Sequence, residues 1–247
     1  MIIHAPVPVA RLAIVIPALD EVEALPETLA SLRRQESDPP FEVVLADGGS
    51  RDGTVSRFRE LTRDWPARGR TARVVACPRP GRAEQMNAGA RAAAGEVLVF
   101  LHADTHLPPG ATLAVQRALA DPVVVGGGFR HSYSEPGALL RIISSWATAR
   151  SLLLGIHYGD QAIFARRSVF EAIGGFPCEP LFEDLVLSRR LRARGRVVTL
   201  PLAVSTSARR LRRGGVARTA ARFAWFKLRH ALGVQSSRLK ARYPDVR

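Results

Sequence analysis

The sequence places metal-capable side chains directly after a strongly apolar segment. The run from Glu96 to Leu101 is apolar after its first residue, and His102 and Asp104 follow it with one residue between them. Such a run is typical of a strand buried on both faces of a parallel sheet, and ligands of such sheets bind beyond the carboxyl ends of the strands. A carboxylate and an imidazole there suit Mg²⁺ or Mn²⁺, which would bring a polyphosphate with it. The alternative for this segment alone is a capped turn before the next helix.

Two other apolar runs also end in acidic residues. Residues 12–16 are followed by Asp20 and Glu21, and residues 41–46 are followed by Asp47. Carboxylates gathered at one edge of a sheet repel one another unless a ligand or cation compensates them, so their convergence favours a ligand site. Asp20 and Asp47 could hydrogen-bond a base and a ribose, although Asp20 could instead cap a helix that starts at Glu21.

The pair Gly48-Gly49 would let the backbone approach such a ligand closely. The chain contains neither the G-x-G-x-x-G fingerprint nor a G-x-x-x-x-G-K-[ST] loop. Both a dehydrogenase and an ATPase are therefore disfavoured.

Alternating strands and helices must position these residues. We predict strands at 12–16, 41–46, 72–76, 96–101, 123–130 and 162–165, and helices at 21–34, 53–63, 81–94, 110–120, 137–153, 167–173, 183–194 and 215–232. This alternation indicates an α/β fold with a doubly wound, mainly parallel sheet and helices on both faces. We expect one domain over residues 1–204 and a basic, amphipathic helical extension over residues 205–247.

The positive charge is concentrated in that extension. The 247 residues carry a net charge of +14, and residues 205–247 hold ten arginines and two lysines against one aspartate, a net +11. Such a segment indicates an anionic partner, although the excess of arginine over lysine throughout the chain also fits a GC-rich coding sequence. Neither a signal peptide nor an 18-residue apolar run is visible, and the two cysteines lack metal-type spacing. We expect a cytoplasmic protein.

Three segments together closely resemble glycosyltransferase family 2: residues 14–21, 43–54 and 81–89. The resemblance covers roughly residues 11–200 and implies a GT-A fold, a nucleotide-diphosphate sugar donor and Mg²⁺ or Mn²⁺. It implies a donor site built from Pro17, Ala18, Asp20, Glu21, Asp47, Gly48, Arg82 and Asp104. Asp104 would be the metal-binding residue of the D-x-D motif. His102 stands where the motif has its first aspartate, so it would contact the metal, the ribose or only the fold.

The segment from Phe182 to Leu191 looks like the family's Glu-Asp motif at a helix start, which implies Glu183 and Asp184 as catalytic residues. An inverting transfer needs a base for the acceptor proton, and we assign Asp184 to it. The alternative is that both carboxylates only favour the helix start. Gly159, Asp160 and Gln161 would face the acceptor, or else form a tight turn.

The C-terminal segment lacks the Gln-x-x-Arg-Trp motif of polymer-forming relatives, so processive synthesis is not expected. Arg209 and Arg210 would clamp the diphosphate, or else form a solvated cluster. The pattern is most similar to a compact bacterial subfamily whose members tend to be encoded beside radical-SAM and selenium- or arsenic-related genes. That resemblance supplies no acceptor, and we favour UDP over GDP as the nucleotide.

Two rival functions remain from the sequence. A nucleotidyltransferase would share the sheet and the acidic site, but it would need a glycine- and lysine-rich loop after the first strand. Residues 17–20 contain neither glycine nor lysine. A basic protein that binds RNA or an acidic membrane would use the extension. The aromatic residues of the extension, Phe223, Trp225 and Phe226, lie among alanines, as core-facing residues do. They are therefore poorly placed to stack on bases, and we expect contact with a membrane rather than with nucleic acid. Membrane docking would also suit a transferase with a lipid-linked acceptor.

Overall fold

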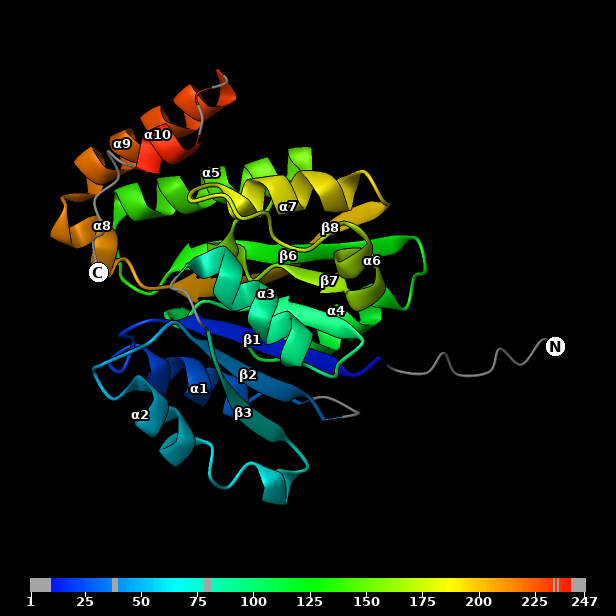
Figure 1. Ribbon diagram of the computed structural model, residues 1–247. Coiled ribbons are helices and arrows are strands. Elements are labelled where there is room, and N and C mark those ends of the chain that lie inside the picture. The colour runs from blue at the N-terminus through cyan, green and yellow to red at the C-terminus, as the bar shows by residue number, and fades with distance from the viewer. Residues whose placement is uncertain (1–9, 37–39, 78–80, 233, 235, 241–247) are drawn as a thin grey trace.

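The computed structural model describes residues 10–36, 40–77, 81–232, 234 and 236–240. Its strands form a single eight-stranded sheet in the order β3-β2-β1-β4-β7-β6-β8-β5 (Figure 1). The strands are β1 (Leu12–Ala18), β2 (Glu42–Asp47), β3 (Thr71–Ala76), β4 (Val97–Phe100), β5 (Thr105–His106), β6 (Val124–Tyr133), β7 (Phe164–Arg166) and β8 (Arg196–Thr206).

Helices cover both faces of this sheet. The α-helices are α1 (Leu25–Arg33), α2 (Thr54–Leu61), α3 (Arg82–Ala92), α4 (Ala111–Leu119), α5 (Ala138–Leu154), α6 (Arg167–Ala172), α7 (Glu183–Arg192), α8 (Arg209–Arg213), α9 (Val216–Ala231) and α10 (Ser236–Lys240). Two 3₁₀ turns, η1 (Pro66–Arg68) and η2 (Gly159–Gln161), complete the described elements.

Strand β1 divides the core because its side chains alternate between the two faces. Leu12, Ile14 and Ile16 pack with residues of α1, α2 and α4 on one face. Ala13 and Val15 pack with residues of α3, α6 and α7 on the other. Every residue of β1 is buried, as expected for a strand covered on both sides. The predicted α/β sheet with helices on both faces is confirmed.

Strands β1 to β4 are parallel, and the strand direction reverses at β7. β1 pairs in parallel with β2 and β4, and β2 pairs in parallel with β3. β7 then runs antiparallel to both β4 and β6. The carboxyl ends of β1, β2 and β4 therefore meet at one edge, where the predicted acidic residues lie.

The sequence analysis missed β8 altogether. β8 pairs in parallel with β6 over most of its eleven residues. It contains Pro201, which lacks a backbone N–H and normally argues against a central strand. Here the register shifts between the pairs Phe129–Leu200 and Arg130–Ala203, so the proline falls in an irregular part of the ladder. The predicted boundary after residue 204 lies inside this strand.

The extension packs on the rest of the chain. Leu211 of α8 and Ala208 before it are buried with Leu140 of α5, and Phe223 of α9 packs against the same cluster. The prediction that the aromatic residues of this helix face the core agrees with Phe226, which is 2% exposed, but is wrong for Trp225, which is 41% exposed. The helix therefore buries its Phe223 and Phe226 side and turns Trp225 outward.

The close packing of β6 generates a stability prediction. A Cβ on Gly127 would lie 2.1 Å from the carbonyl oxygen of Val198 and 2.8 Å from the Phe164 ring. Gly127→Ala must displace backbone, so we expect it to lower the free energy of unfolding by about 1–3 kcal/mol, measured by urea denaturation. Gly137→Ala is the control, because its Cβ would meet only Leu140 at 3.4 Å. Equal stability of the two variants would contradict the packing described here.

Candidate active site

The ends of β1 and β2 are held together by one buried amide. The Nε2 atom of Gln85, on α3, donates to the carbonyl oxygens of Ala18 at 2.5 Å and Ala46 at 3.0 Å. A Cβ on Gly48 would lie 2.9 Å from that nitrogen, so glycine is required for this close approach. Gln85 had no predicted role, although it lies inside the 81–89 segment that carries the family resemblance.

Asp20 and Asp47 organise the loops that follow these strands. The Asp47 carboxylate, which is buried, accepts the Gly49 N–H at 3.1 Å and the Ser50 hydroxyl at 2.5 Å. Asp20 accepts the Arg51 N–H at 2.8 Å and has a left-handed backbone with φ of 55°. The Asp47 carboxylate also accepts the Ser50 N–H at 3.2 Å, so it fixes the start of the loop through three donors. Both residues lie together, as the strand-end argument predicted.

Asp20 does not cap α1, because that helix begins at Leu25 and not at Glu21. The intervening turn is tied to the loop after β2 instead: the Glu21 N–H donates to the Thr54 hydroxyl at 2.9 Å. The Val22 N–H donates to Asp52 at 3.0 Å. The predicted helix start was early because these cross-loop bonds hold the segment in a non-helical path.

Arg209 joins the acidic groups of two strand ends. Its guanidinium donates to the Glu21 carboxylate after β1, and its Nε lies 3.9 Å from Oδ2 of Asp104 after β4. Burial opposes its charge, but Glu21 and Asp104 outweigh that effect and raise the pKa of Arg209. Arg210 lies in the same helix, but its side chain falls outside the described residues.

The acidic residues here suit a metal ion whose coordination shell is completed by the phosphates of a bound ligand. Among the described residues no group of three or more His, Cys, Asp or Glu could hold a metal ion. Mg²⁺ is commonly held by one or two carboxylates together with substrate phosphates and water. The buried, nearly covered Asp104 carboxylate fits that pattern, and Pro17 and Ala18 form the end of β1 nearby.

Gly159 brings the end of β4 and the start of α7 together. Its N–H donates to Oδ2 of Asp184 at 2.9 Å. On its other side, a Cβ would lie 2.3 Å from Nε2 of His102, so the imidazole packs directly on the Gly159 backbone. His102 is thus turned toward the 3₁₀ turn η2. The structure unites His102, Gly159 and Asp184, which the sequence placed in three separate motifs.

Asp184 is the most perturbed acid in this cluster. Burial of its carboxyl, and then the charge of Glu183 beside it, raise the pKa of Asp184 to about 7 despite the Gly159 hydrogen bond. Glu183 is buried and pairs with Arg82 of α3 at 3.3 Å. The charge of Glu183 therefore adds to the effect of burial on Asp184, whereas Arg82 favours the ionised carboxylate and opposes it.

Asp160 and Gln161 have different surroundings. Oδ2 of Asp160 lies 3.6 Å from Nε2 of His131, a buried histidine whose pKa is lowered by burial, with Asp160 opposing that shift. Gln161 is fully buried, donates to the Phe129 carbonyl at 3.0 Å and accepts from Arg150. The predicted acceptor role of Gln161 stays a prediction, since its side chain has internal partners.

Residues that the sequence analysis did not single out complete this side. The Arg150 guanidinium lies 3.8 Å and the Lys227 ammonium 4.4 Å from the centre of the Tyr158 ring. Lys227 as a residue is exposed, and the protein atoms that surround its ammonium lower the pKa of Lys227 by desolvation. Only the fold could reveal this contact, because Lys227 comes from α9, far along the chain.

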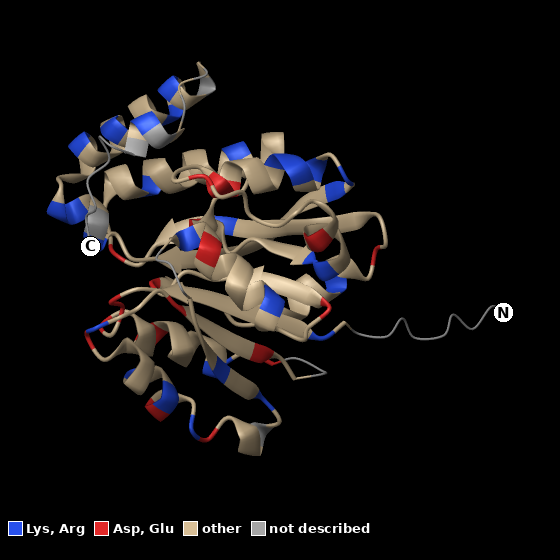
Figure 2. Ribbon diagram, viewed as in Figure 1, with Lys and Arg blue, Asp and Glu red and all other residues tan. Residues whose placement is uncertain are grey.

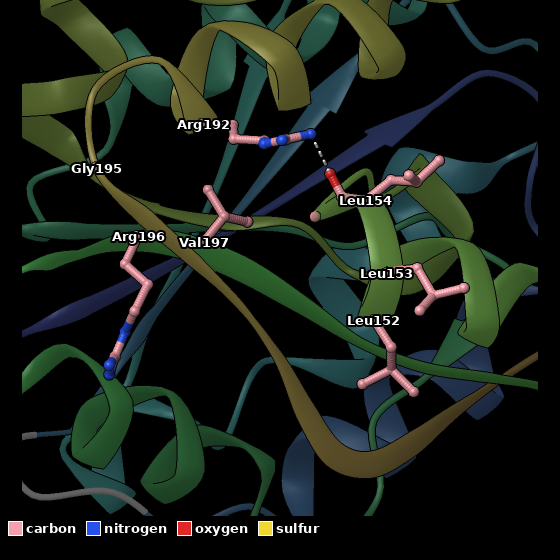
Figure 3. A pocket seen from close by; sticks show the side chains of 8 residues that line it. Leu152, Leu153, Leu154, Arg192, Gly195, Arg196 and Val197 are labelled. Atoms are coloured by element: carbon pink, nitrogen blue, oxygen red, sulfur yellow. Dashed lines mark hydrogen bonds between the residues drawn. The ribbon is translucent and has the colours of Figure 1, made fainter.

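A separate pocket lies at the C-terminal ends of α5 and α7. It has a volume of about 360 Å³ and is lined by Leu152, Leu153, Leu154, Gly155, Arg192, Gly195, Arg196 and Val197. Figure 3 shows Arg192 donating to the Leu154 carbonyl, at 2.8 Å. α7 begins with Glu183 at the acidic cluster and ends with Arg192 at this pocket. No predicted site residue lines the pocket.

Comparison with known proteins gives a family-level match. The model of Glycosyl transferase family 2 matches residues 13–174. A PGL/p-HBAD biosynthesis glycosyltransferase of Mycobacterium bovis is 32% identical over 168 residues, which are 66% of this chain and 62% of that protein. An undecaprenyl-phosphate 4-deoxy-4-formamido-L-arabinose transferase of Pseudomonas aeruginosa is 30% identical over 181 residues, 68% of this chain and 50% of that protein.

Among solved structures, the mannosyltransferase PcManGT from Pyrobaculum calidifontis, in complex with GDP-Man and Mn²⁺, superposes with a TM-score of 0.65. It is 25% identical, and the match covers 83% of this chain and 61% of that one. This likeness confirms the predicted GT-A fold. The chain spans 62% of the length of the Mycobacterium relative and 50% of the length of the Pseudomonas relative.

The raised pKa of Asp184 predicts a pH-dependent cost in stability. The pKa of Asp184 is about 7 in the folded protein, above its value of about 4 in the unfolded chain. Below about pH 4 the carboxyl is protonated in both states and the free energy of unfolding is unaffected. Between about pH 4 and pH 7 the unfolded chain loses this proton first, so the free energy of unfolding falls as the pH rises. Asp184→Asn removes this cost. We expect the variant to be more stable than the parent at pH 8, by about 1–3 kcal/mol, with the gain vanishing toward pH 4 in urea titrations.

Asp64→Asn is the control for this measurement, because Asp64 is an exposed partner of Arg33. Its effect should be constant between pH 5 and pH 8. A flat difference for Asp184→Asn over the same range would show that Asp184 titrates as an ordinary aspartate.

Proposed function

This chain belongs to glycosyltransferase family 2, and from that premise we propose an inverting transfer from a nucleoside-diphosphate sugar to an acceptor hydroxyl, with Asp184 as the general base. The observation that carries the proposal is the setting of Asp184. Its carboxylate is oriented by the Gly159 N–H at 2.9 Å, and burial raises its pKa to about 7. A base with a pKa near ambient pH is ionised often enough to act and basic enough to take a proton.

The proposed step is a single displacement. The acceptor oxygen passes its proton to Asp184 and forms a bond to the anomeric carbon. The bond from that carbon to the diphosphate breaks on the opposite face, and the nucleoside diphosphate leaves with the electron pair. The charge of the buried Glu183 adds to the burial that raises the pKa of Asp184, and the exposed Arg82, 3.3 Å from Glu183, partly offsets it. Glu183 is therefore proposed as a positioning residue rather than a second base.

The donor would bind at the ends of β1, β2 and β4. Asp20 and Asp47 would accept hydrogen bonds from the base and ribose, with Pro17, Ala18 and Gly48 beside them. A bound Mg²⁺ or Mn²⁺ at Asp104 would neutralise charge on the leaving diphosphate. Arg209, already beside Asp104 and Glu21, is proposed as a diphosphate ligand, and Arg210 stays a prediction.

The identities of the nucleotide and the acceptor are part of the proposal. The sequence favoured UDP, whereas the 25% identical mannosyltransferase was solved with GDP-Man and Mn²⁺, so both donors belong in any assay. The name of the Pseudomonas relative includes undecaprenyl phosphate, which supports testing lipid-linked acceptors beside simple alcohols. The cytoplasmic location, the membrane contact of the basic extension and the neighbouring radical-SAM genes remain predictions.

Substitution of the base tests the reaction. We expect Asp184→Asn to lower nucleotide release from UDP-glucose or GDP-mannose, with water or an added alcohol as acceptor, by roughly 10²–10⁴-fold. Donor affinity should stay nearly unchanged, and activity of the parent should rise with pH around a midpoint near 7. Asp121→Asn, at an exposed ion pair with Arg196, is the matched control. An Asp184→Asn enzyme with most of its activity would remove Asp184 from this role.

Calorimetry tests the donor side independently of turnover. UDP and GDP should bind weakly in the presence of chelator and at least tenfold more tightly with Mn²⁺ or Mg²⁺, because a cation held by Asp104 would neutralise charge on the diphosphate. Asp104→Asn should abolish the effect of the metal while leaving the metal-free affinity close to that of the parent. Equal affinity with and without chelator would exclude the metal role.

A further inference from the structure

Large apolar side chains are exposed along one side of α5. Leu139, Ile142, Trp146 and Leu153 are 39%, 54%, 74% and 82% exposed. At 3.6 residues per turn they fall within an arc of about 60°, so they form one continuous ridge. The opposite side of the helix buries Leu140 and Ser144. Scattered surface leucines are ordinary, but a ridge of this kind marks an interaction surface.

The neighbouring helix α9 adds a second apolar row. Trp225, Leu228 and Leu232 just after the helix are 41%, 59% and 71% exposed, and they are spaced by three and four residues. α9 packs against α5 through Phe223, and the two helices lie side by side at the top of Figure 1. The two exposed rows thus belong to adjacent elements.

The helices that carry these rows hold basic residues and no acidic ones. No acidic residue occurs in residues 138–154 or in residues 205–240, and Figure 2 shows α8 and α9 with blue segments and no red. Arg141 and Arg218 are exposed beside the apolar rows, and the Arg229 guanidinium lies 5.5 Å from the centre of the Trp225 ring. Exposed tryptophan and leucine flanked by arginine is the composition of helices that lie in a membrane interface.

We propose that the exposed rows of α5 and α9 form a docking surface that inserts into the face of a bilayer containing anionic phospholipid. The apolar side chains enter the boundary between headgroups and acyl chains, and the flanking arginines contact the phosphates. None of the described helices is long and apolar enough to cross a bilayer, which agrees with a surface-bound geometry. This docking surface differs from one formed by the basic extension alone, because four of its seven exposed apolar side chains belong to α5.

The surface lies beside the acceptor side of the site. Lys227 of α9 covers Tyr158, and His230 at the end of α9 stacks on Phe182, with ring centres 4.6 Å apart, directly before Glu183. The residues directly before Asp184 therefore pack against the side of α9 opposite its exposed row, so α9 would lie between the bilayer and this part of the site. The docking itself rests on the exposed side chains and does not require the proposed transfer reaction.

Vesicle flotation of the full chain tests the proposal. We expect the protein to float with phosphatidylglycerol-containing vesicles at low salt, to float much less at high salt, and to stay behind with pure phosphatidylcholine. Tryptophan emission should shift to the blue on binding, because Trp146 and Trp225 are exposed whereas Trp65 is buried. Absence of flotation with anionic vesicles at low salt would overturn the proposal.

Matched variants separate the apolar and the basic contributions. The double substitution Trp146→Ser and Leu153→Ser should lower vesicle partitioning by about tenfold or more, whereas Val123→Ser, at a site 61% exposed on another part of the fold, should not. Arg141→Glu with Arg218→Glu should abolish the preference for anionic lipid. Arg59→Glu with Arg63→Glu makes the same charge change at exposed positions in and near α2 and should leave the preference intact.

Two outcomes contradict the docking surface even if the protein floats. Unchanged partitioning of the Trp146→Ser and Leu153→Ser variant would show that charge alone holds the protein on the vesicle. A dimer in light scattering that this variant disrupts would assign the ridge to a second copy of the chain. Circular dichroism of the variants verifies folding, and the substituted side chains are exposed, so the comparison does not depend on core packing.

Discussion

The site depends on how closely the Gly159 backbone approaches its neighbours. The peptide N–H of Gly159 binds the Asp184 carboxylate, and its Cα lies against the His102 ring. Any side chain at this position would push the end of β4 away from the start of α7. Since Asp104 follows β4 and Asp184 lies in the first turn of α7, this contact sets the relation between the proposed donor and acceptor sides. A glycine that is buried in the cluster thus has as much influence on the geometry as the carboxylates.

Much of the donor side could be predicted from the sequence because its information is local. Apolar runs predict strands, the carboxyl ends of parallel strands share an edge, and the acidic residues follow directly in the chain. The positions of Asp20, Asp47 and Asp104 then follow from topology. The start of α1 was less accurate, because bonds to the Thr54 hydroxyl and to Asp52 decide it, and those partners lie 33 and 30 residues away. The end of β1 was also placed too early, because its last residues pair with β2 as far as Asp47.

The acceptor side could not be predicted in the same way. His131 and Tyr158 look like ordinary core residues in the sequence, and Lys227 looks like one cation in a basic helix. They matter because antiparallel β7 and the long strand β8 fold the second half of the chain back onto the first. Pro201 concealed β8, and the face that α9 buries depends on its packing against α5 rather than on its own periodicity, since apolar residues occur on two sides of that helix.

The ion pair between Arg209 and Glu21 has a consequence for the order in which the protein matures on the ribosome. The two residues are 188 positions apart in the chain, so the strand ends emerge long before their cation does. The early βα units can collapse as they are synthesised, but their acidic rim has no Arg209 until α8 has left the exit tunnel. The proposed donor site is therefore completed last. Nascent chains released early would hold a folded core whose acidic edge is still uncompensated, and such chains would differ from the finished protein mainly in their electrostatics.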